Sequence, residues 1–378
     1  MTTAFDPVEY HGRLARAQQA MARAGLAALL LTTEAELRYF TGFLTRFWES
    51  PSRPWFLVVP VSGQPVAVIP SIGAALMAKT WITDIRTWPA PRPADDGVTL
   101  LAETLRELAQ GGDIAMPMGY ETALRMPLAD LRRVEALIAP GRILPDDGLV
   151  AALRAIKSPA EVALIETACG IAGRAFARLP EIAAEGVPLS TVFRDFQALC
   201  LAEGADWVPY LAGSAGQGGY DDVISPATDA PLRRGDLLML DTGLVHQGYF
   251  CDFDRNWSVG PASPGQAEGW QRLRRATEAG REAIRPGARA CDLFHAMAAV
   301  TGAGEGGRLG HGLGMQLTEG LSLTAEDQTE LRPGMVLTLE PGISLPGGGI
   351  MVHEDDFVVT ETGARQLSPS APADLPEL

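Results

Sequence analysis

The sequence predicts an α+β protein of two domains, with a smaller α/β domain over residues 1–148 and a pseudo-symmetric α+β domain over residues 149–378. The chain of 378 residues is longer than one ordinary hydrophobic core accommodates. Short apolar runs alternate with helical periodicity in the first part. In the second part, segments 232–243 and 331–342 are nearly alike, which predicts two related half-domains.

The first domain alternates predicted helices and strands, a pattern typical of α/β domains. Apolar periodicity predicts helices over 10–24, 71–79, 98–110 and 121–138. Apolar runs predict strands over 27–31, 55–59, 66–69 and 113–116. The turn sequence Ser62-Gly63-Gln64 lies between the middle two runs and predicts a hairpin.

Turn residues over 145–148 mark the predicted domain boundary. Ser158, Pro159 and Glu161 then form a capping-box signature that begins a predicted helix over 159–181. A helix over 189–203, strands within 207–260, and helices over 264–283 and 290–300 follow. One of the two similar segments precedes the last two helices and the other follows them. The second domain is therefore predicted to be pseudo-symmetric.

Composition limits the classes of function. Hydrophobic residues make up 47% and charged residues 20%, which is typical of a globular protein. The net charge of −15 argues against a nucleic-acid partner, because phosphate binding needs a basic surface. Four cysteines without a C-x-x-C pair, no signal-peptide pattern and no apolar run of transmembrane length predict a cytoplasmic protein with no membrane partner.

Each of the two similar segments consists of a turn, a short apolar strand, one carboxylate and a glycine. Asp241 is predicted to end the first strand and Glu340 the second. A carboxylate at the end of a buried strand needs a strong electrostatic partner. Asp252 follows a turn at Gly248, and we expect the antiparallel pair to bring it face to face with Asp241. Glu354 follows the glycine hairpin 347–349 in the same manner.

His311 lies between two glycines, which suits a ligand that the backbone approaches closely. Taken alone, an acid after a strand is most often a turn residue, but the repeated segments connect these residues. Two Asp, two Glu and one His suit divalent Mn, Co, Fe or Zn. Four clustered carboxylates would repel one another, and two such ions would offset their charge. A metal pair of this kind activates water and polarises a carbonyl, which predicts hydrolysis.

At these residues the chain resembles the M24 metallopeptidase and creatinase family, which has the pita-bread fold and includes Xaa-Pro aminopeptidases and prolidases. Segment 154–161 resembles the start of the family's catalytic domain, and 39–43 resembles the signature of its N-terminal domain. The resemblance implies two metal ions held by five residues, Asp241, Asp252, His311, Glu340 and Glu354. It also implies that Asp252 and Glu354 bridge the ions, that Asp241 holds one ion, and that His311 and Glu340 hold the other. Glu340 would additionally assist the attacking water.

The chain departs from the family pattern at four positions. Family peptidases usually carry histidines where this chain has Ile224 and Thr318, and these normally contact the substrate or stabilise the tetrahedral intermediate. The arginine common in proline-specific members is replaced by Val352. The usual Asp-x-Thr-Arg motif has Asp254 in place of the threonine.

Two residues are candidates to replace the missing catalytic groups. His353 neighbours Glu354, although strand alternation points its side chain to the opposite face. Glu319 lies one residue beyond Thr318 and is a candidate acid/base or ammonium binder, with a solvated surface side chain as the alternative.

Three further residues are candidates for substrate binding. Tyr220 follows a glycine-rich loop and is expected to border the pocket. Arg46 and Trp48 belong to an aromatic and charged loop over 46–51, where the indole can cover a small cationic substrate. The alternative for Trp48 is an aromatic side chain packed within the loop.

Three functions remain open. The first is a dinuclear metal hydrolase of the Xaa-Pro aminopeptidase or dipeptidase type, in which a metal-bridged hydroxide attacks an amide carbonyl of a small peptide; the resemblance implies a homodimer. The second is a non-peptidase relative that hydrolyses or cleaves a small zwitterion, such as an ectoine- or sulfonium-type compound. The third is a catalytically silent binding module.

Overall fold

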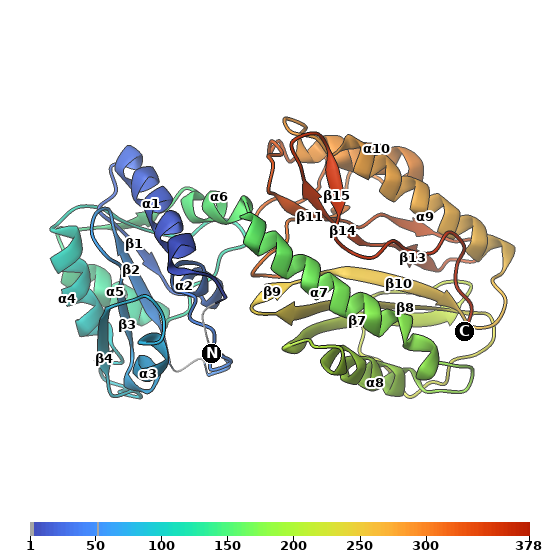
Figure 1. The fold of residues 1–378 in the computed structure, drawn as a ribbon, viewed down its shortest axis with the longest axis horizontal. Helices are drawn as coiled ribbons and strands as arrows, with labels where there is room; N and C mark the ends of the chain where they lie inside the picture. The colour runs from blue at the N-terminus through green and yellow to red at the C-terminus, as the bar shows by residue number, and fades with distance from the viewer. Residues whose placement is uncertain (1–3, 51–52) are drawn as a thin grey trace. The chain divides into compact units, whose positions relative to one another are not determined.

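The computed structural model describes residues 4–50 and 53–378, and the chain forms two compact units, Met1–Arg154 and Ala155–Leu378 (Figure 1). The first three residues, where a signal peptide would begin, lie outside the described part. Each unit has its own sheets and helices, and each is described separately below.

A six-stranded sheet forms the centre of the N-terminal unit, in the order β4-β3-β2-β1-β5-β6. The strands are β1 (Ala28–Leu31), β2 (Phe56–Pro60), β3 (Val66–Pro70), β4 (Asp84–Trp88), β5 (Ile114–Met116) and β6 (Ile143–Pro145). The β2–β3 pair is antiparallel, as the predicted hairpin requires. The β1–β5, β5–β6 and β3–β4 pairs are parallel.

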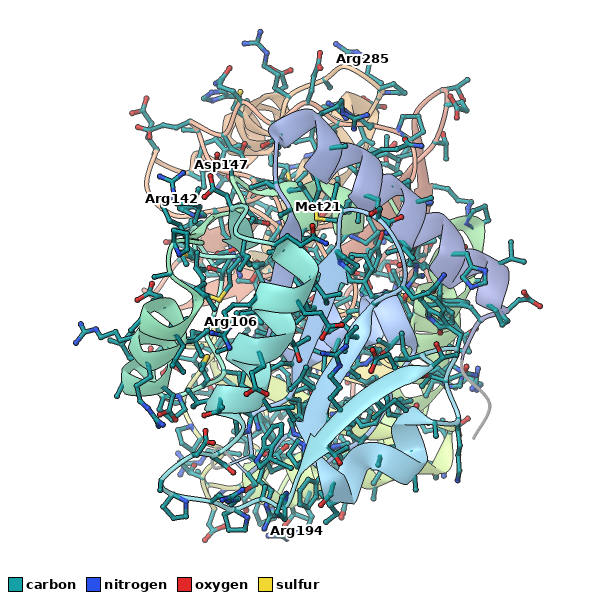
Figure 2. The ribbon with its side chains drawn as sticks, turned by 90° about the vertical axis from the view of Figure 1, so that its left-hand side faces the viewer. Met21, Arg106, Arg142, Asp147, Arg194 and Arg285 are labelled. Carbon is teal, nitrogen blue, oxygen red and sulfur yellow. The ribbon has the colours of Figure 1, made fainter. Side chains whose placement is uncertain are left out.

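The helices of this unit are α1 (Pro7–Ala24), α2 (Glu34–Thr41), α3 (Ala74–Met77), α4 (Val98–Ala109), α5 (Leu128–Ile138) and α6 (Leu149–Ala155). Apolar residues of α4 and α5 pack with strand residues in one cluster, which covers a face of the sheet. Figure 2 looks onto this unit; Met21 of α1 is buried, whereas Arg106 of α4 and Arg142 are exposed. The helix predicted over 121–138 begins only at Leu128, because the residue before Pro127 is disfavoured in a helical conformation.

The first half of the C-terminal unit joins α7 (Pro159–Ala177) and α8 (Leu189–Ala202) to an antiparallel sheet. Its strands are β7 (Trp207–Gln217), β8 (Asp236–His246), β9 (Tyr249–Phe250) and β10 (Phe253–Ser258), and β8 lies between β7 and β10. The predicted capping box of α7 is confirmed, since Ser158 and Glu161 exchange side-chain-to-backbone hydrogen bonds. The helix ends earlier than predicted, at Ala177, and a short 3₁₀ turn follows.

The second half contains α9 (Pro264–Ala283) and α10 (Ala290–Thr301), followed by five short strands. They are β11 (Val336–Leu339), β12 (Gly342–Ser344), β13 (Ile350–Val352), β14 (Asp355–Val359) and β15 (Ala364–Gln366). One sheet has the order β11-β14-β15, and β12 pairs with β13. In Figure 1, α9 and α10 flank this group of strands, while α7 and α8 flank the first group.

Two predictions about the first repeated segment are wrong. Asp241 does not end its strand, because β8 continues to His246 with a hydrogen-bonded neighbour on each side. Asp252 does not lie opposite Asp241 either; the register of β8 and β10 places Asp254 there. The reason is that β10 begins only at Phe253, so Asp252 lies in the link from β9. In the second segment, Glu340 directly follows β11, as predicted.

Among the helices of residues 4–50 and 53–378, none combines the length and apolar character that crossing a membrane requires.

Candidate metal centre

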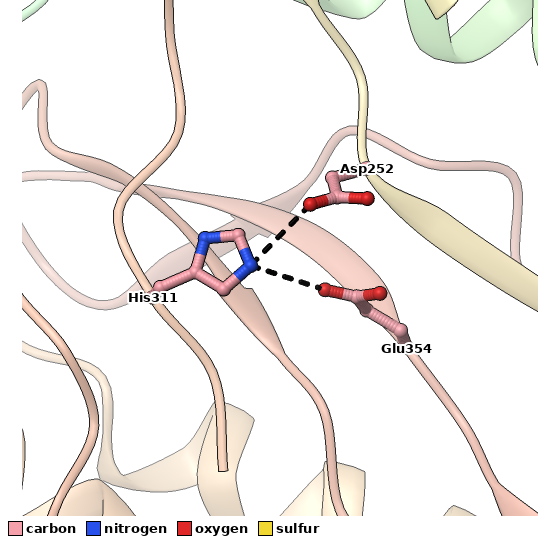
Figure 3. Close-up of side chains that lie close together, drawn as sticks. All are labelled: Asp252, His311 and Glu354. Carbon is pink, nitrogen blue, oxygen red and sulfur yellow. Dashed lines mark ion pairs between the residues drawn. The ribbon is translucent and has the colours of Figure 1, made fainter. Parts of the chain in front are cut away.

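Three buried side chains from distant parts of the C-terminal unit converge on one point. His311 Nε2 lies 3.3 Å from Asp252 Oδ2 and 3.8 Å from Glu354 Oε1 (Figure 3). One ligand atom from each of the three residues lies within 4.8 Å of the others. A histidine nitrogen and two carboxylate oxygens at this separation can bind one divalent cation.

Links between strands hold these side chains in place. Asp252 lies between β9 and β10, and Glu354 lies between β13 and β14. His311 belongs to segment 309–313, which runs antiparallel to β11, with Gly312 bridged to Leu337. The Glu340 N–H donates to the Leu309 carbonyl at 2.9 Å, which fixes Glu340 beside the histidine segment.

The glycines on either side of His311 are required by close backbone contacts. Gly310 has φ +142°, and a Cβ there would lie 2.2 Å from the Thr338 carbonyl oxygen. A Cβ on Gly312 would lie 2.1 Å from the Glu319 carbonyl oxygen. Any larger residue would push the histidine segment away from β11 or from the following loop.

Asp241 and Glu340 lie within electrostatic reach of this group. Burial, and then the charges of Asp241 and Glu340 among others, raise the pKa of Asp252 well above its usual value. Burial raises the pKa of Glu340 to about 7, although Arg308 opposes the rise. The Tyr210 hydroxyl donates to Asp241 Oδ2 at 3.0 Å. The charges of Asp241 and Glu340 thus act on the Asp252–His311–Glu354 group, and of these five residues only Glu340 is partly exposed. We refer to the five residues that the family resemblance implies as the five-residue cluster.

The donor atoms of this cluster fit divalent cations. Three buried carboxylate oxygens of the five-residue cluster accept no hydrogen bond from the described residues: Asp241 Oδ1, Asp252 Oδ1 and Glu354 Oε1. Burial, followed by the charge of Arg308, lowers the pKa of His311 to about 4, so the imidazole is neutral. Its Nδ1 lies 3.0 Å from the Gly312 carbonyl, so we assign the proton to that nitrogen. The lone pair of Nε2 then faces two carboxylates, an arrangement that a cation between them makes favourable.

His353 is buried in a group of charged residues behind the cluster. Its Nδ1 lies 3.2 Å from Asp254 Oδ1, and its Nε2 lies 3.1 Å from Asp355 Oδ2. Arg255 Nη2 lies 3.0 Å from the other oxygen of Asp355. Burial lowers the pKa of His353, but its two carboxylate partners outweigh burial and raise it overall. The imidazole thus contacts Asp254, the residue that replaces the family's usual threonine.

Glu319 and Tyr220 also have partners in the C-terminal unit. Glu319 Oε1 forms a buried ion pair with Lys157 Nζ at 3.0 Å. The Tyr220 hydroxyl accepts the Val352 N–H at 2.7 Å and donates to Asn256 Oδ1 at 3.2 Å. These contacts attach Tyr220 to β13 next to Glu354. The predicted roles of Glu319 and Tyr220 in the reaction stay predictions.

Arg46 and Trp48 belong to the N-terminal unit, whose placement relative to the cluster is not defined. Trp48 is buried and packs on Trp55, with ring centroids 5.8 Å apart. Arg46 is half exposed, and its Nη2 lies 3.8 Å from Glu49 Oε1. Pro51, at the end of the predicted loop, lies outside the described residues. The predicted substrate roles of Arg46 and Trp48 stay predictions.

Two residues near the five-residue cluster, Tyr210 and Arg308, are not predicted from the sequence. Tyr210 reaches Asp241 only through the β7–β8 pairing, which a single sequence does not specify. Arg308 is exposed, and its charge acts on Asp252, His311 and Glu340. Arg308 Nη2 also donates to Thr318 Oγ1 at 3.3 Å, at the position of a missing family histidine.

Comparison with protein families agrees with this geometry. Residues 163–361 match the model of metallopeptidase family M24, and residues 13–156 match the creatinase/prolidase N-terminal domain. The first match covers more than half of the chain. The predicted fold class, an α+β pita-bread domain after a creatinase-type N-terminal domain, is thereby confirmed, as is the prediction of an M24-type enzyme.

Individual relatives extend the similarity over nearly the whole chain. The probable dipeptidase PepE of Mycobacterium tuberculosis is 32% identical over 379 residues, covering 96% of each chain. The solved structure of dipeptidase PepE from Mycobacterium ulcerans is 29% identical, with a TM-score of 0.84 and 99% of each chain covered. An N-terminal domain of the FACT subunit SPT16 from chickpea shares the fold alone, at 15% identity, a TM-score of 0.78 and 98% of each chain covered. With a buried His/carboxylate cluster and family matches in both units, the chain belongs to metallopeptidase family M24.

Proposed function

We propose that this protein is a two-metal dipeptidase that hydrolyses the amide bond of a small peptide of the Xaa-Pro type. The observation that carries the proposal is the buried Asp252–His311–Glu354 group with its unpartnered carboxylate oxygens. The peptidase reaction is supported by relatives that are similar to this chain over nearly its full length and are named dipeptidases. An Xaa-Pro dipeptidase of Pyrococcus horikoshii is 33% identical over 229 residues, covering 59% of this chain and 65% of the relative.

We assign the metal ligands within the five-residue cluster. Asp252 and Glu354 would contact both ions, Asp241 one of them, and His311 and Glu340 the other. Manganese, cobalt, zinc or iron ions, when bound, lower the pKa of a coordinated water and polarise the substrate carbonyl. The chain's own contribution is a buried site in which four carboxylates are held close together by the strand links.

Glu340 is the residue we assign to proton transfer. Its pKa, raised by burial to about 7, suits a group that accepts a proton and returns it near neutral pH. Because Glu340 directly follows β11, its backbone is held firmly during this exchange.

Glu319 and His353 stay catalytic candidates, and Tyr220, Arg46 and Trp48 stay candidates for substrate contact. We propose a homodimer in the cytoplasm; four buried free cysteines suit a reducing compartment. Sedimentation velocity tests the dimer directly.

The residues that differ from the family pattern favour a second function. Ile224, at one histidine position, is 82% exposed, and Thr318 and Val352 bring neither an imidazole nor a guanidinium. Such a site suits a non-peptidase hydrolase or lyase of a small zwitterion. The silent binding module is the third candidate, and retention of the whole ligand set argues against it.

The deciding experiment measures bound metal and substrate turnover in the same samples. Wild type reconstituted with Mn²⁺ or Co²⁺ is offered Xaa-Pro dipeptides and, separately, ectoine- and sulfonium-type zwitterions. We expect peptide hydrolysis by wild type and loss of both metal and activity in Asp252→Ala. The exposed acid Glu268 on α9 supplies the control, since Glu268→Ala should leave metal and activity unchanged. Turnover of zwitterions alone would replace the peptidase proposal with the second function.

A further inference from the structure

Two additional buried acids form reciprocal contacts behind the proposed ligands. Asp254 lies two residues after Asp252, and its Oδ1 accepts the backbone N–H of Glu354 at 2.9 Å. Asp356 lies two residues after Glu354, and its Oδ2 accepts the backbone N–H of Asp252 at 3.0 Å. Each acid thus reaches across to the ligand of the other half-domain. The two hydrogen bonds fix the backbones of Asp252 and Glu354 relative to each other.

Stability alone does not explain two further carboxylates at this place. Asp254 is 1% exposed and Asp356 is fully buried, and each contacts the backbone of another buried acid. One oxygen of each, Asp254 Oδ2 and Asp356 Oδ1, accepts no hydrogen bond from the described residues. A buried carboxyl with an unpartnered oxygen costs free energy, and an apolar or hydroxyl side chain would avoid that cost.

The protein offsets only part of this cost. His353 contacts Asp254 on one side and Asp355 on the other, at 3.2 and 3.1 Å. The Cys169 thiol donates to Asp356 Oδ2 at 3.2 Å. His353 is therefore a buried partner of Asp254, the residue that replaces the family's usual threonine.

We propose that Asp254 and Asp356 are positioning residues that set the separation of Asp252 and Glu354, and hence the affinity of the site for divalent metal. The inference rests on the proposed function, because it takes Asp252 and Glu354 as metal ligands. A carboxylate that accepts a backbone N–H forms a strong, directional hydrogen bond. Residues that orient metal ligands in this way typically change metal affinity by about 10–100-fold when they are replaced.

The test compares substitutions that remove the acceptor oxygen with substitutions that keep it. Asp356→Ala and Asp254→Ala remove the acceptor for the ligand's N–H, and each should weaken Mn²⁺ binding by about tenfold or more. Asp356→Asn and Asp254→Thr keep an oxygen that can accept this N–H, so each should recover most of the affinity. Isothermal titration of the metal-free protein with Mn²⁺ gives affinity and stoichiometry without relying on turnover.

A matched control separates positioning from general loss of stability. Asp236 is a buried acid at the start of β8 whose Oδ2 accepts the backbone N–H of Arg233 at 2.7 Å. Asp236→Ala removes the same kind of contact at a distance from the five-residue cluster. It should lower the unfolding temperature while leaving Mn²⁺ affinity as in wild type. If Asp254→Ala or Asp356→Ala fails to fold, Asp254→Thr is compared with Asp254→Val, and Asp356→Asn with Asp356→Leu. In each pair, the first side chain keeps an oxygen that can accept the backbone N–H and the second lacks it.

The results distinguish this inference from the proposed function. A wild-type protein that binds no divalent metal would overturn both. A wild type that binds two ions, together with Ala variants that bind them equally tightly, would overturn the positioning role and leave the proposed function intact. Weak Mn²⁺ binding by the Ala variants, together with recovered affinity in the Asn and Thr variants, would support the positioning role.

Discussion

The Tyr210 hydroxyl connects β7 to the five-residue cluster through one hydrogen bond. It donates to Asp241 Oδ2 at 3.0 Å, and burial together with nearby carboxylates raises the pKa of the phenol far above its usual value. The hydroxyl therefore stays protonated and can only donate to Asp241. This contact occupies one oxygen of Asp241, and the second oxygen, which accepts no hydrogen bond from the described residues, stays available to the proposed cation.

Replacing Tyr210 with phenylalanine should weaken metal binding more than it weakens the fold. Loss of a hydrogen bond to a carboxylate costs about 1.5–3 kcal/mol, and we expect roughly tenfold lower Mn²⁺ affinity. Tyr249→Phe is the matched control, since the Tyr249 hydroxyl donates to Glu161 Oε1 at 2.9 Å. It should destabilise the unit with no change in affinity. Equal metal affinities of Tyr210→Phe and wild type in titration calorimetry would contradict the prediction.

For single residues, the sequence predicts which side chains belong to the candidate site better than it predicts the contacts between them. The acids and His311 were found because the strand-and-carboxylate segment is repeated and because the chain resembles a known family. Asp254 was visible as a departure from the family motif and His353 as a catalytic candidate, but the contact between them was not predicted, since it depends on how the two half-domains meet. Tyr210 and Arg308 were missed because neither forms part of a local pattern.

A buried ion pair fixes the loop after His311 to the start of α7. Lys157 Nζ lies 3.0 Å from Glu319 Oε1, and both side chains are less than a tenth exposed. The Lys157 N–H also donates to the Gly334 carbonyl at 2.9 Å, in the turn before β11. Three elements that surround the five-residue cluster are thus connected through one lysine.

Removing the lysine alone should destabilise the C-terminal unit strongly. Lys157→Met removes the cation that faces the buried Glu319 carboxylate, and breaking a buried ion pair in this way costs about 3–5 kcal/mol. The double variant Lys157→Met/Glu319→Gln should recover a large part of that loss, because no charge is then left without a partner. Urea unfolding of wild type, both single variants and the double variant measures the coupling. Additive losses would show that the pair makes no specific contribution.

Elements with strong end signals were predicted well. Ser158 and Pro159 begin α7 as expected, and the two α9/α10 helices lie where periodicity placed them. The helix α2 was not predicted, because it has only eight residues, too few for an apolar period to stand out, and nearly all of its side chains are buried. The length of β8 was underestimated, since a central strand continues through Asp241 when both neighbouring strands supply hydrogen bonds.

At the scale of the whole molecule, metal should stabilise only one of the two units. All five residues of the cluster lie within Ala155–Leu378, and the N-terminal unit has its own sheet and core. Without cations, burial and mutual repulsion raise the pKa values of the clustered carboxyls, so the site opposes folding. A ligand that binds only the folded state stabilises it by about 2.7 kcal/mol per site at a free concentration of 100 times Kd.

Differential scanning calorimetry of metal-free and Mn²⁺-loaded protein tests this expectation. The transition of the C-terminal unit should move to a higher temperature with metal, and that of the N-terminal unit should stay where it is. Asp252→Ala should show no metal-dependent shift. A shift of both transitions by the same amount would contradict independent unfolding of the units.

The positions of the cysteines give the protein a built-in chemical reporter. All four, Cys169, Cys200, Cys251 and Cys291, belong to the C-terminal unit, and all are buried. A thiol-directed reagent therefore has nothing to modify until that unit opens, and opening of the N-terminal unit alone exposes no thiol. The rate of labelling measures how often the metal-binding half opens, in unmodified protein and without an introduced dye.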